Sequence, residues 1–363
     1  MFNSSRMTIA RQRAGLTKKE LAQRIGVEPR AITGFEAGQY VPSTENIERI
    51  ARATGFSREF FDADDLELLD ARGVSFRSLT KMTAKQRDAA IAAGSIAFVL
   101  SDWTDQIFEL PGVDLPDFRG ADPETAAQSL RQHWGLGERP IKNMIHLLEL
   151  KGIRVFSLAE NCQEVDAYSV WRGRRPFVFL NTQKSGERRR FDAAHELAHL
   201  VLHQNSAPNG VEAEKEAHAF AGAFLMPKAS LRAYGRVAPN LDYITKLKRE
   251  WGVSVAAMTS RLHELGLLTY YHYNRLYVEL SSKGWRTSEP LGMKPETSQV
   301  WQKVFADLRQ HGQGLQFLAG KLQIPPGEIA KLVFSLVTVG LPSSDLTSSS
   351  IPNGEKGHLR VIK

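Results

Sequence analysis

The chain has one cysteine, Cys162, among its 363 residues. A single cysteine excludes an internal disulfide framework and fits a reducing compartment. The sequence also lacks the run of about 20 apolar residues that a membrane-spanning helix needs, and its first residues lack the apolar core of a secretory signal. These absences predict a cytoplasmic protein without a membrane partner.

Acidic residues are fewer than basic ones: the chain has 40 Asp and Glu but 47 Lys and Arg, which gives a formal net charge of +7. A positive balance favours contact with polyanions such as nucleic acid. The charge is spread along the chain, so it supports this interpretation without locating a site. The length predicts two or three domains with their own cores.

The most informative motif is the pair His195 and His199, four residues apart in an apolar helical pattern. Residues four apart lie one above the other on a helix, so both imidazoles can reach one ion. Glu196 stands beside them as a carboxylate that can take a proton from the water on that ion. The spacing predicts a zinc metalloenzyme in which His195 and His199 are ligands and Glu196 is the general base.

A third ligand is expected on the next helix, predicted from Glu212 to Met226 after a loop at 204–210 and ended by Pro227. Glu216 borders the apolar stripe of this helix and is the predicted ligand. Glu214 borders the other side of the stripe, so the pattern alone does not separate the two. The remaining competitors are Glu212, His218 and His203.

Two segments carry a resemblance to a known family: His195-Glu196-Leu197-Ala198-His199, and Glu216-Ala217-His218-Ala219-Phe220-Ala221 followed by Leu225-Met226-Pro227. This pairing resembles the ImmA/IrrE family of metallopeptidases, and the similarity covers most of residues 121–275. The resemblance implies a zincin-like peptidase domain with Zn²⁺ bound by His195, His199 and Glu216. Ala198 departs slightly, because the family often has glycine there.

A second motif lies near the amino terminus. Thr17 and Glu20 can form a capping box, Gly26 can make a tight turn, and Pro29 suits the first turn of the next helix. The spacing predicts a helix-turn-helix within residues 7–60. The segment resembles the Xre (Cro/repressor-like) DNA-binding domains, which implies binding to double-stranded operator DNA.

Positions on this motif assign the expected DNA contacts. Arg30 and Thr33 lie where the second helix meets base edges, with Arg30 suited to guanine. Thr17, Lys18 and Gln39 are placed to meet phosphates. Gly34 leaves a gap where such helices often carry another base reader. By analogy to the family, Arg11 and Glu36 are expected to pair with each other and to be structural.

The expected fold class is α+β and predominantly helical, with five segments along the chain. They are a helix-turn-helix domain at 1–65, a helical linker or spacer at 66–120, the peptidase domain with a small β-sheet at 121–275, a helical module at 276–344 and a disordered tail at 345–363. Strands are predicted at 154–157, 168–171 and 177–180, and the last could be a sheet edge that binds substrate, although a core strand fits it equally well. Two further segments with helix-turn-helix spacing, 241–265 and 315–332, are expected to serve packing or protein contacts rather than DNA.

The sequence therefore predicts a DNA-binding transcriptional regulator with a zinc-dependent endopeptidase domain. The family resemblance suggests a transcriptional repressor or another protein partner as substrate. The alternative is a repressor or antitoxin-like protein whose peptidase-like domain is a sensor or partner-binding module with little turnover. A homodimer is expected because helix-turn-helix proteins commonly bind paired half-sites.

Overall fold

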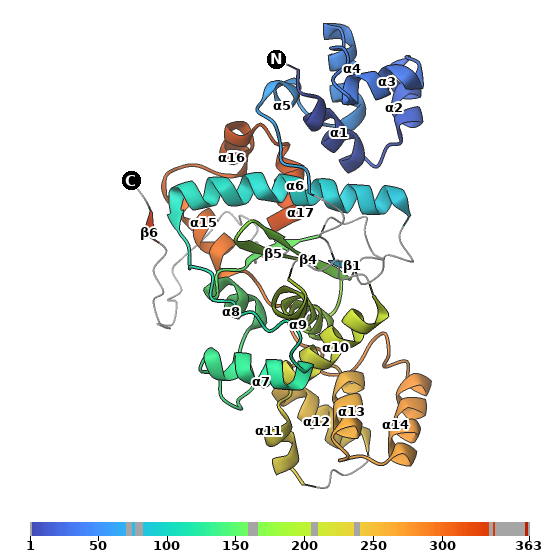
Figure 1. Cartoon of the computed structure of the whole chain (residues 1–363), viewed down its shortest axis with the longest axis vertical. Coiled ribbons are helices and arrows are strands. Elements are labelled where there is room, and N and C mark those ends of the chain that lie inside the picture. Colours follow the sequence, from blue (N-terminus) through green and yellow to red (C-terminus); the bar gives the residue numbers. More distant parts are fainter. Residues whose placement is uncertain are drawn as a thin grey trace, which may run out of the picture.

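The computed structural model describes residues 2–69, 75–76, 83–158, 166–204, 210–235, 240–333, 337 and 360–361. Its architecture is α+β and mostly helical, as the sequence predicted. The chain is layered, with the amino-terminal helices above the long helix α6, a small sheet beneath α6, and further helices below the sheet (Figure 1). Within the described residues, no helix is both long enough and apolar enough to cross a membrane.

Five short helices form the amino-terminal domain: α1 (Ser4–Arg13), α2 (Lys18–Ile25), α3 (Pro29–Glu36), α4 (Thr44–Thr54) and α5 (Arg58–Asp62). The predicted capping box is present, because Thr17 Oγ1 accepts from the Glu20 amide and Glu20 accepts from the Thr17 amide. Gly26 ends α2 in the left-handed region at φ 73°. A side chain would be strained there, so glycine permits the sharp turn into α3.

The main sheet has the strand order β1-β4-β5-β3. Its strands are β1 (Ser75–Phe76), β4 (Ala167–Arg172), β5 (Arg175–Leu180) and β3 (Arg154–Ser157), and only the β3–β5 pair is parallel. The three predicted strands are confirmed. The suggestion that 177–180 is an edge is wrong, because β5 is paired on both sides and its Phe177–Leu180 segment is buried.

Helix α6 (Ala84–Ile107) covers one face of this sheet. The Tyr168 hydroxyl donates to the Ala90 carbonyl over 3.0 Å, and the rings of Phe98 and Phe177 pack edge to face. The expectation of a helical spacer is therefore wrong for α6, since twelve of its residues are buried. An amphipathic pattern cannot distinguish a solvated spacer from a helix that packs on a sheet far along the chain.

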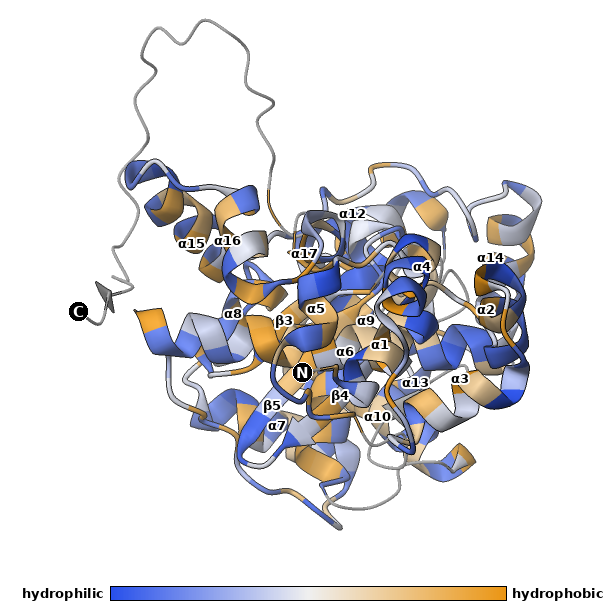
Figure 2. Ribbon diagram, turned by 90° about the horizontal axis from the view of Figure 1, so that it is seen from above, coloured by the Kyte–Doolittle hydropathy of each residue, from blue (hydrophilic) through white to orange (hydrophobic). Residues whose placement is uncertain are grey.

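The opposite face of the sheet carries the helices of the HExxH region. These are α9 (Gly186–Leu202), the adjoining α10 (Val211–Leu225), and α7 (Pro123–His133) and α8 (Met144–Leu150) around them. Trp171 of β4 donates from Nε1 to the Leu200 carbonyl of α9 over 3.2 Å. Apolar residues gather where α6, the strands and α9 overlap, while the outer helices are largely polar outside (Figure 2).

The remaining helices form two groups around this core. One group contains α11 (Lys228–Ala233), α12 (Leu241–Trp251), α13 (Val255–Glu264) and α14 (Tyr270–Ser282), and the other contains α15 (Gln299–Gln310), α16 (Leu315–Leu322) and α17 (Pro326–Val333). The short strands β2 (Phe108–Glu109) and β6 (Arg360–Val361) pair antiparallel. Most of the predicted tail, Cys162 and residues 205–209 of the predicted loop lie outside the described residues.

Candidate functional site

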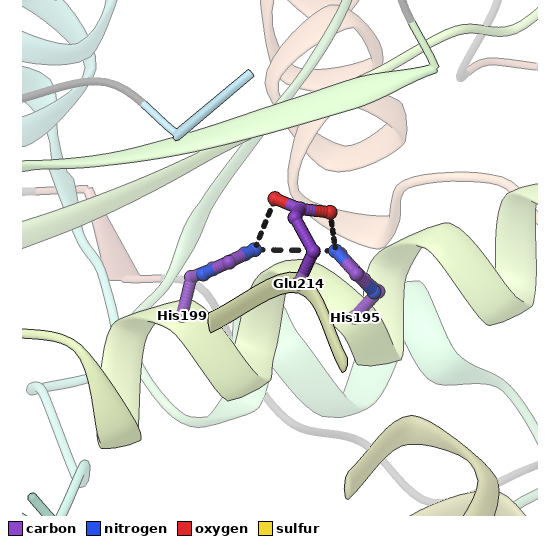
Figure 3. A group of neighbouring side chains, drawn as sticks. All are labelled: His195, His199 and Glu214. Carbon is purple, nitrogen blue, oxygen red and sulfur yellow. Dashed lines mark hydrogen bonds and ion pairs between the residues drawn. The ribbon is translucent and has the colours of Figure 1, made fainter. Parts of the chain in front are cut away.

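Three polar side chains meet between α9 and α10. His195 Nε2 and His199 Nε2 lie 3.1 Å apart, and the two carboxylate oxygens of Glu214 lie 3.2 Å from His195 Nε2 and 3.4 Å from His199 Nε2. The histidines rise from one face of α9 and the carboxylate reaches over them from α10 (Figure 3). Both histidines are buried and Glu214 is partly buried.

The spacing of these atoms fits a metal ion. Two ligands held at about 2.0–2.1 Å from a tetrahedral zinc lie roughly 3.3 Å from each other, and the three measured separations are 3.1, 3.2 and 3.4 Å. Two imidazole lone pairs that face each other this closely repel unless a proton or cation lies between them. Two imidazoles and one carboxylate are also a donor set typical of catalytic zinc.

The predicted third ligand, Glu216, is not in this cluster. Its Oε2 lies 2.8 Å from His203 Nε2 instead, and Glu214 takes the place beside the histidines. Residues two apart on a helix point about 200° apart, so only one of these two carboxylates can face α9 directly. Both residues border the apolar stripe of α10, and in the structure the border with Glu214 faces the histidines.

Glu216 nevertheless reaches the cluster through a histidine. His203 Nδ1 lies 3.0 Å from His199 Nδ1, and His203 Nε2 faces Glu216. One pattern of protons satisfies every atom: His203 donates from Nε2 to Glu216, and His199 donates from Nδ1 to His203. His199 then keeps the Nε2 lone pair for a metal, which is how an outer carboxylate fixes the tautomer of a ligating histidine.

Glu214 has the charge that a ligand requires. Burial alone would raise its pKa, but the hydrogen bonds with His195 and His199 outweigh burial and hold the pKa well below its usual range. The carboxylate is therefore ionised at neutral pH.

The expected general base, Glu196, lies on α9 between the two histidines and is buried. Ser169 Oγ of β4 donates to Glu196 Oε2 over 2.7 Å. Tyr168 faces α6 whereas Ser169 faces α9, because alternate residues of a strand point to opposite sides. This contact was not predicted, since Ser169 is 27 residues from Glu196 and no local motif marks it.

The helix-turn-helix has its own polar surface. Arg30, Thr33, Thr17 and Gln39 are exposed, and Lys18 is half-exposed. Lys18 Nζ also lies 3.3 Å from Glu36, so part of its charge is balanced within the domain. Arg11 pairs with the same Glu36 at 2.5 Å and donates to the Leu16 carbonyl, which agrees with the structural role expected for this pair.

The expectation that Gly34 leaves a gap on the reading face is wrong. Gly34 is buried beneath Tyr40, and a Cβ at this position would lie 2.2 Å from the Tyr40 ring and hydroxyl. The Tyr40 hydroxyl donates to the Arg30 carbonyl over 3.4 Å, and its ring packs edge to face on Phe35. Tyr40 remains 48% exposed and therefore adds an amphipathic ring to the surface that carries Arg30.

The fold and the two polar sites define a DNA-binding regulator with a metallopeptidase-like domain. Residues 9–61 match the family model described as helix-turn-helix, and residues 148–263 match the Peptidase_M78 model, described as the IrrE N-terminal-like domain. An uncharacterised HTH-type transcriptional regulator of Methanothermobacter thermautotrophicus is 44% identical over 63 residues, which are 17% of this chain and 86% of that relative. The chain belongs to the helix-turn-helix family of transcriptional regulators and carries an M78 peptidase-family domain, so both resemblances are confirmed.

Proposed function

We propose that this protein is a zinc-dependent endopeptidase that regulates transcription by cleaving a protein partner, while its amino-terminal domain binds operator DNA. The observation that carries the proposal is the cluster of His195, His199 and Glu214 at ligand spacing with Glu196 beside it. The M78 family match supports the class of enzyme. A transcriptional repressor is the proposed substrate, on the strength of the family resemblance.

His195 and His199 would hold the metal from α9, and Glu214 would hold it from α10. A bound Zn²⁺ would supply a Lewis acid that polarises the scissile carbonyl and makes water more acidic. Glu196 accepts the proton of the attacking water and returns it to the leaving amine. Ser169 Oγ donates to one oxygen of that carboxylate, which helps to hold it in place beside the two histidines.

The DNA-binding half of the proposal rests on Arg30 and Thr33 at the exposed face of α3 and on Thr17, Lys18 and Gln39 around it. Helix α1 contacts α6 through Arg13, which donates to the Ala89 carbonyl and pairs with Glu328 of α17. The helix-turn-helix is thus docked on the peptidase body rather than separated from it by a spacer. A cytoplasmic location follows for a protein that binds operator DNA.

One observation favours the alternative function, a DNA-binding protein whose peptidase-like domain is a sensor with little turnover. Strand β1, which follows the helix-turn-helix along the chain, pairs with β4 at Tyr168 and Ser169. Extended substrates commonly bind a sheet edge by adding a strand, and β1 covers that edge next to Glu196. Turnover would then require β1 to move.

The Glu196→Gln chain tests the proposal. It should keep its zinc and its operator binding, because Glu196 is not a ligand, but it should fail to relieve repression of a reporter from the operator promoter. An immunoblot of the transcriptional regulator encoded by the neighbouring gene should show cleavage in cells with the wild-type protein and none in cells with Glu196→Gln. Equal reporter output and an intact regulator in both backgrounds would favour the sensor function instead.

A further inference from the structure

A cavity of about 600 Å³ lies beside the histidine cluster. One wall comes from α9 and α10, and the other comes from α13, α14 and the segment that follows α14. Its volume is in the range typical of pockets that enclose a small ligand or a short piece of peptide. The metal ligands themselves do not line it, so it extends the candidate site in one direction.

The cavity continues the faces that carry the cluster. Arg188 and Asp192 line it from α9, and His195 and His199 follow on the same face at spacings of three and four residues. On α10, the lining residues His218 and Gly222 follow Glu214 at intervals of four. The rings of Phe191 and His218 meet with centroids 4.9 Å apart, one helical turn from the cluster on both helices. The cavity therefore begins about one helical turn from the metal cluster along both helices.

The opposite wall is formed largely by α13, which belongs to the segment 241–265 with helix-turn-helix spacing. Ala256, Ala257 and Ser260 of helix α13 line the cavity. This face of α13 is therefore turned toward α9 and is not exposed for insertion into a DNA groove. This placement agrees with the expectation that 241–265 does not bind DNA. The small side chains on α13, together with Gly222 on α10, leave the space open.

Buried polar contacts fix this wall to α9. Lys248 Nζ of α12 donates to Glu187 Oε1 over 2.8 Å, and the Met293 amide donates to the same oxygen over 2.7 Å. The amide of Val255, the first residue of α13, donates to Glu289 Oε2 over 2.7 Å. Since both walls are joined by paired groups, the cavity is a built part of the domain rather than a loose gap.

The chemistry of the lining residues indicates which kind of side chain the cavity accepts. Phe191, Met226, Tyr277 and Trp285 offer aromatic faces and a thioether, which pack well against large apolar side chains. Charged residues line the cavity as well: Arg188, Arg286 and Glu264 are exposed, whereas Glu187, Asp192 and Arg261 are buried. Two of the buried charges are neutralised by ion pairs, Glu187 with Lys248 and Arg261 with Glu124. We propose that this cavity is the specificity pocket of the peptidase and receives a large aliphatic or aromatic side chain next to the scissile bond. This inference rests on the proposed function, because it places a peptide at the metal.

A pair of metal chelators tests the pocket without turnover. Acetohydroxamate reports the metal alone, whereas 3-phenylpropanohydroxamate adds an apolar arm that can enter the cavity. In the zinc-loaded full chain, calorimetry should give the phenyl compound a dissociation constant lower by roughly tenfold or more, as expected when an aromatic ring is buried. Ala257→Trp should remove this preference by filling the cavity, and Ala257→Leu should reduce it. Ala219→Trp, at an exposed position of α10 outside the lining, is the matched control and should keep the preference.

The outcomes separate this inference from the proposed function. Equal affinity of wild type for both compounds, or a preference that survives Ala257→Trp in protein with full zinc content, overturns the pocket. Failure of both compounds to bind contradicts the metal centre and the pocket with it. A preference that holds in a chain with no peptidase activity supports the pocket and counts against catalysis. Cuts in a mixture of peptides, mapped by mass spectrometry, should also show large apolar residues at one position beside the cleaved bond and should lose that preference in Ala257→Trp.

Discussion

His203 Nε2 lies 2.8 Å from Glu216 Oε2, and the other ring nitrogen of His203 lies 3.0 Å from His199 Nδ1. The carboxylate expected to bind the metal is thus joined to His199 by two hydrogen bonds through His203. Its place suggests a supporting role, in which it orients His203 and, through His203, the ring of His199. Glu214 and Glu216 are both acidic residues of α10, but they are expected to differ in what their removal does.

Glu214→Ala should abolish tight zinc binding, because it removes one of three ligands. Glu216→Ala should retain zinc with an affinity lower by about 10- to 100-fold, which is typical when the partner of a ligating histidine is lost. Competition with a chelator of known zinc affinity measures both effects. Glu212→Ala, at an exposed position of the same helix, is the matched control and should bind as wild type does. Loss of zinc from Glu216→Ala but not from Glu214→Ala would restore the ligand set that the family resemblance implies.

Arg30→Ala should reduce discrimination between operator and random DNA by about 1–3 kcal/mol, since a bidentate contact to guanine would be lost. Lys18→Ala should weaken binding to both DNAs by a similar factor and lower the salt dependence, because phosphate contacts carry little sequence information. Gel shifts with the region upstream of the gene measure both quantities. Lys283→Ala, directly after the distant helix α14, should change neither. Unchanged discrimination in Arg30→Ala would mean that the reading face lies elsewhere.

Lys248→Met should lower the free energy of unfolding by about 3–5 kcal/mol, because it leaves the carboxylate of Glu187 buried without its cation. The side chains of both residues are only 1% exposed. The double variant Lys248→Met/Glu187→Gln should recover part of the loss, since the carboxylate of Glu187 is then uncharged and only Glu289, which lies 3.6 Å from Lys248, still lacks its cation. Urea unfolding followed by circular dichroism gives the comparison. A double variant as unstable as the single variant would show that packing, not charge, is the cause.

Stability should also depend on pH through Glu149, which caps the start of α15. Burial raises the pKa of Glu149 from 4.5 to about 7, against hydrogen bonds from Ser298, Gln299 and Val300 that favour the charged form. The folded chain then holds this proton more tightly than the unfolded chain does. The contribution is complete below the ordinary value of 4.5 and is lost as the pH rises through about 7.

The free energy of unfolding should therefore fall by roughly 3 kcal/mol between these limits because of this one group. The side chain of Gln has no acidic proton to lose. The free energy of unfolding of Glu149→Gln should therefore change less than that of wild type over the same pH range. Urea titrations at several pH values in that range, with wild type measured in parallel, provide the test. Identical pH dependence in the two proteins would assign the effect to other groups.

Local sequence patterns determined much of the fold. The capping box of Thr17 and Glu20, the turn at Gly26 and the strands at 154–157 and 177–180 were all predicted, because each depends on neighbours within a few residues. The spacing of His195 and His199 likewise fixes their common face on any helix. The family match could be read from the same short segments.

Contacts between distant segments decided the rest. The sequence pattern of helix α6 predicted a spacer. The structure packs it on a sheet whose strands lie some 80 residues later in the chain. Ser169 reaches Glu196, and Tyr40 fills the space above Gly34, only because separate elements pack together.

The positions of Glu214 and Glu216 show most clearly what the sequence pattern does not determine. Both residues border the apolar stripe of α10, so hydrophobic periodicity alone treats them almost alike. The sequence determined that a helix rich in acidic residues would follow the HExxH helix. Only the tertiary structure decided which border faces the histidines, because the side on which α9 lies depends on how two helices pack and not on the pattern of either helix alone.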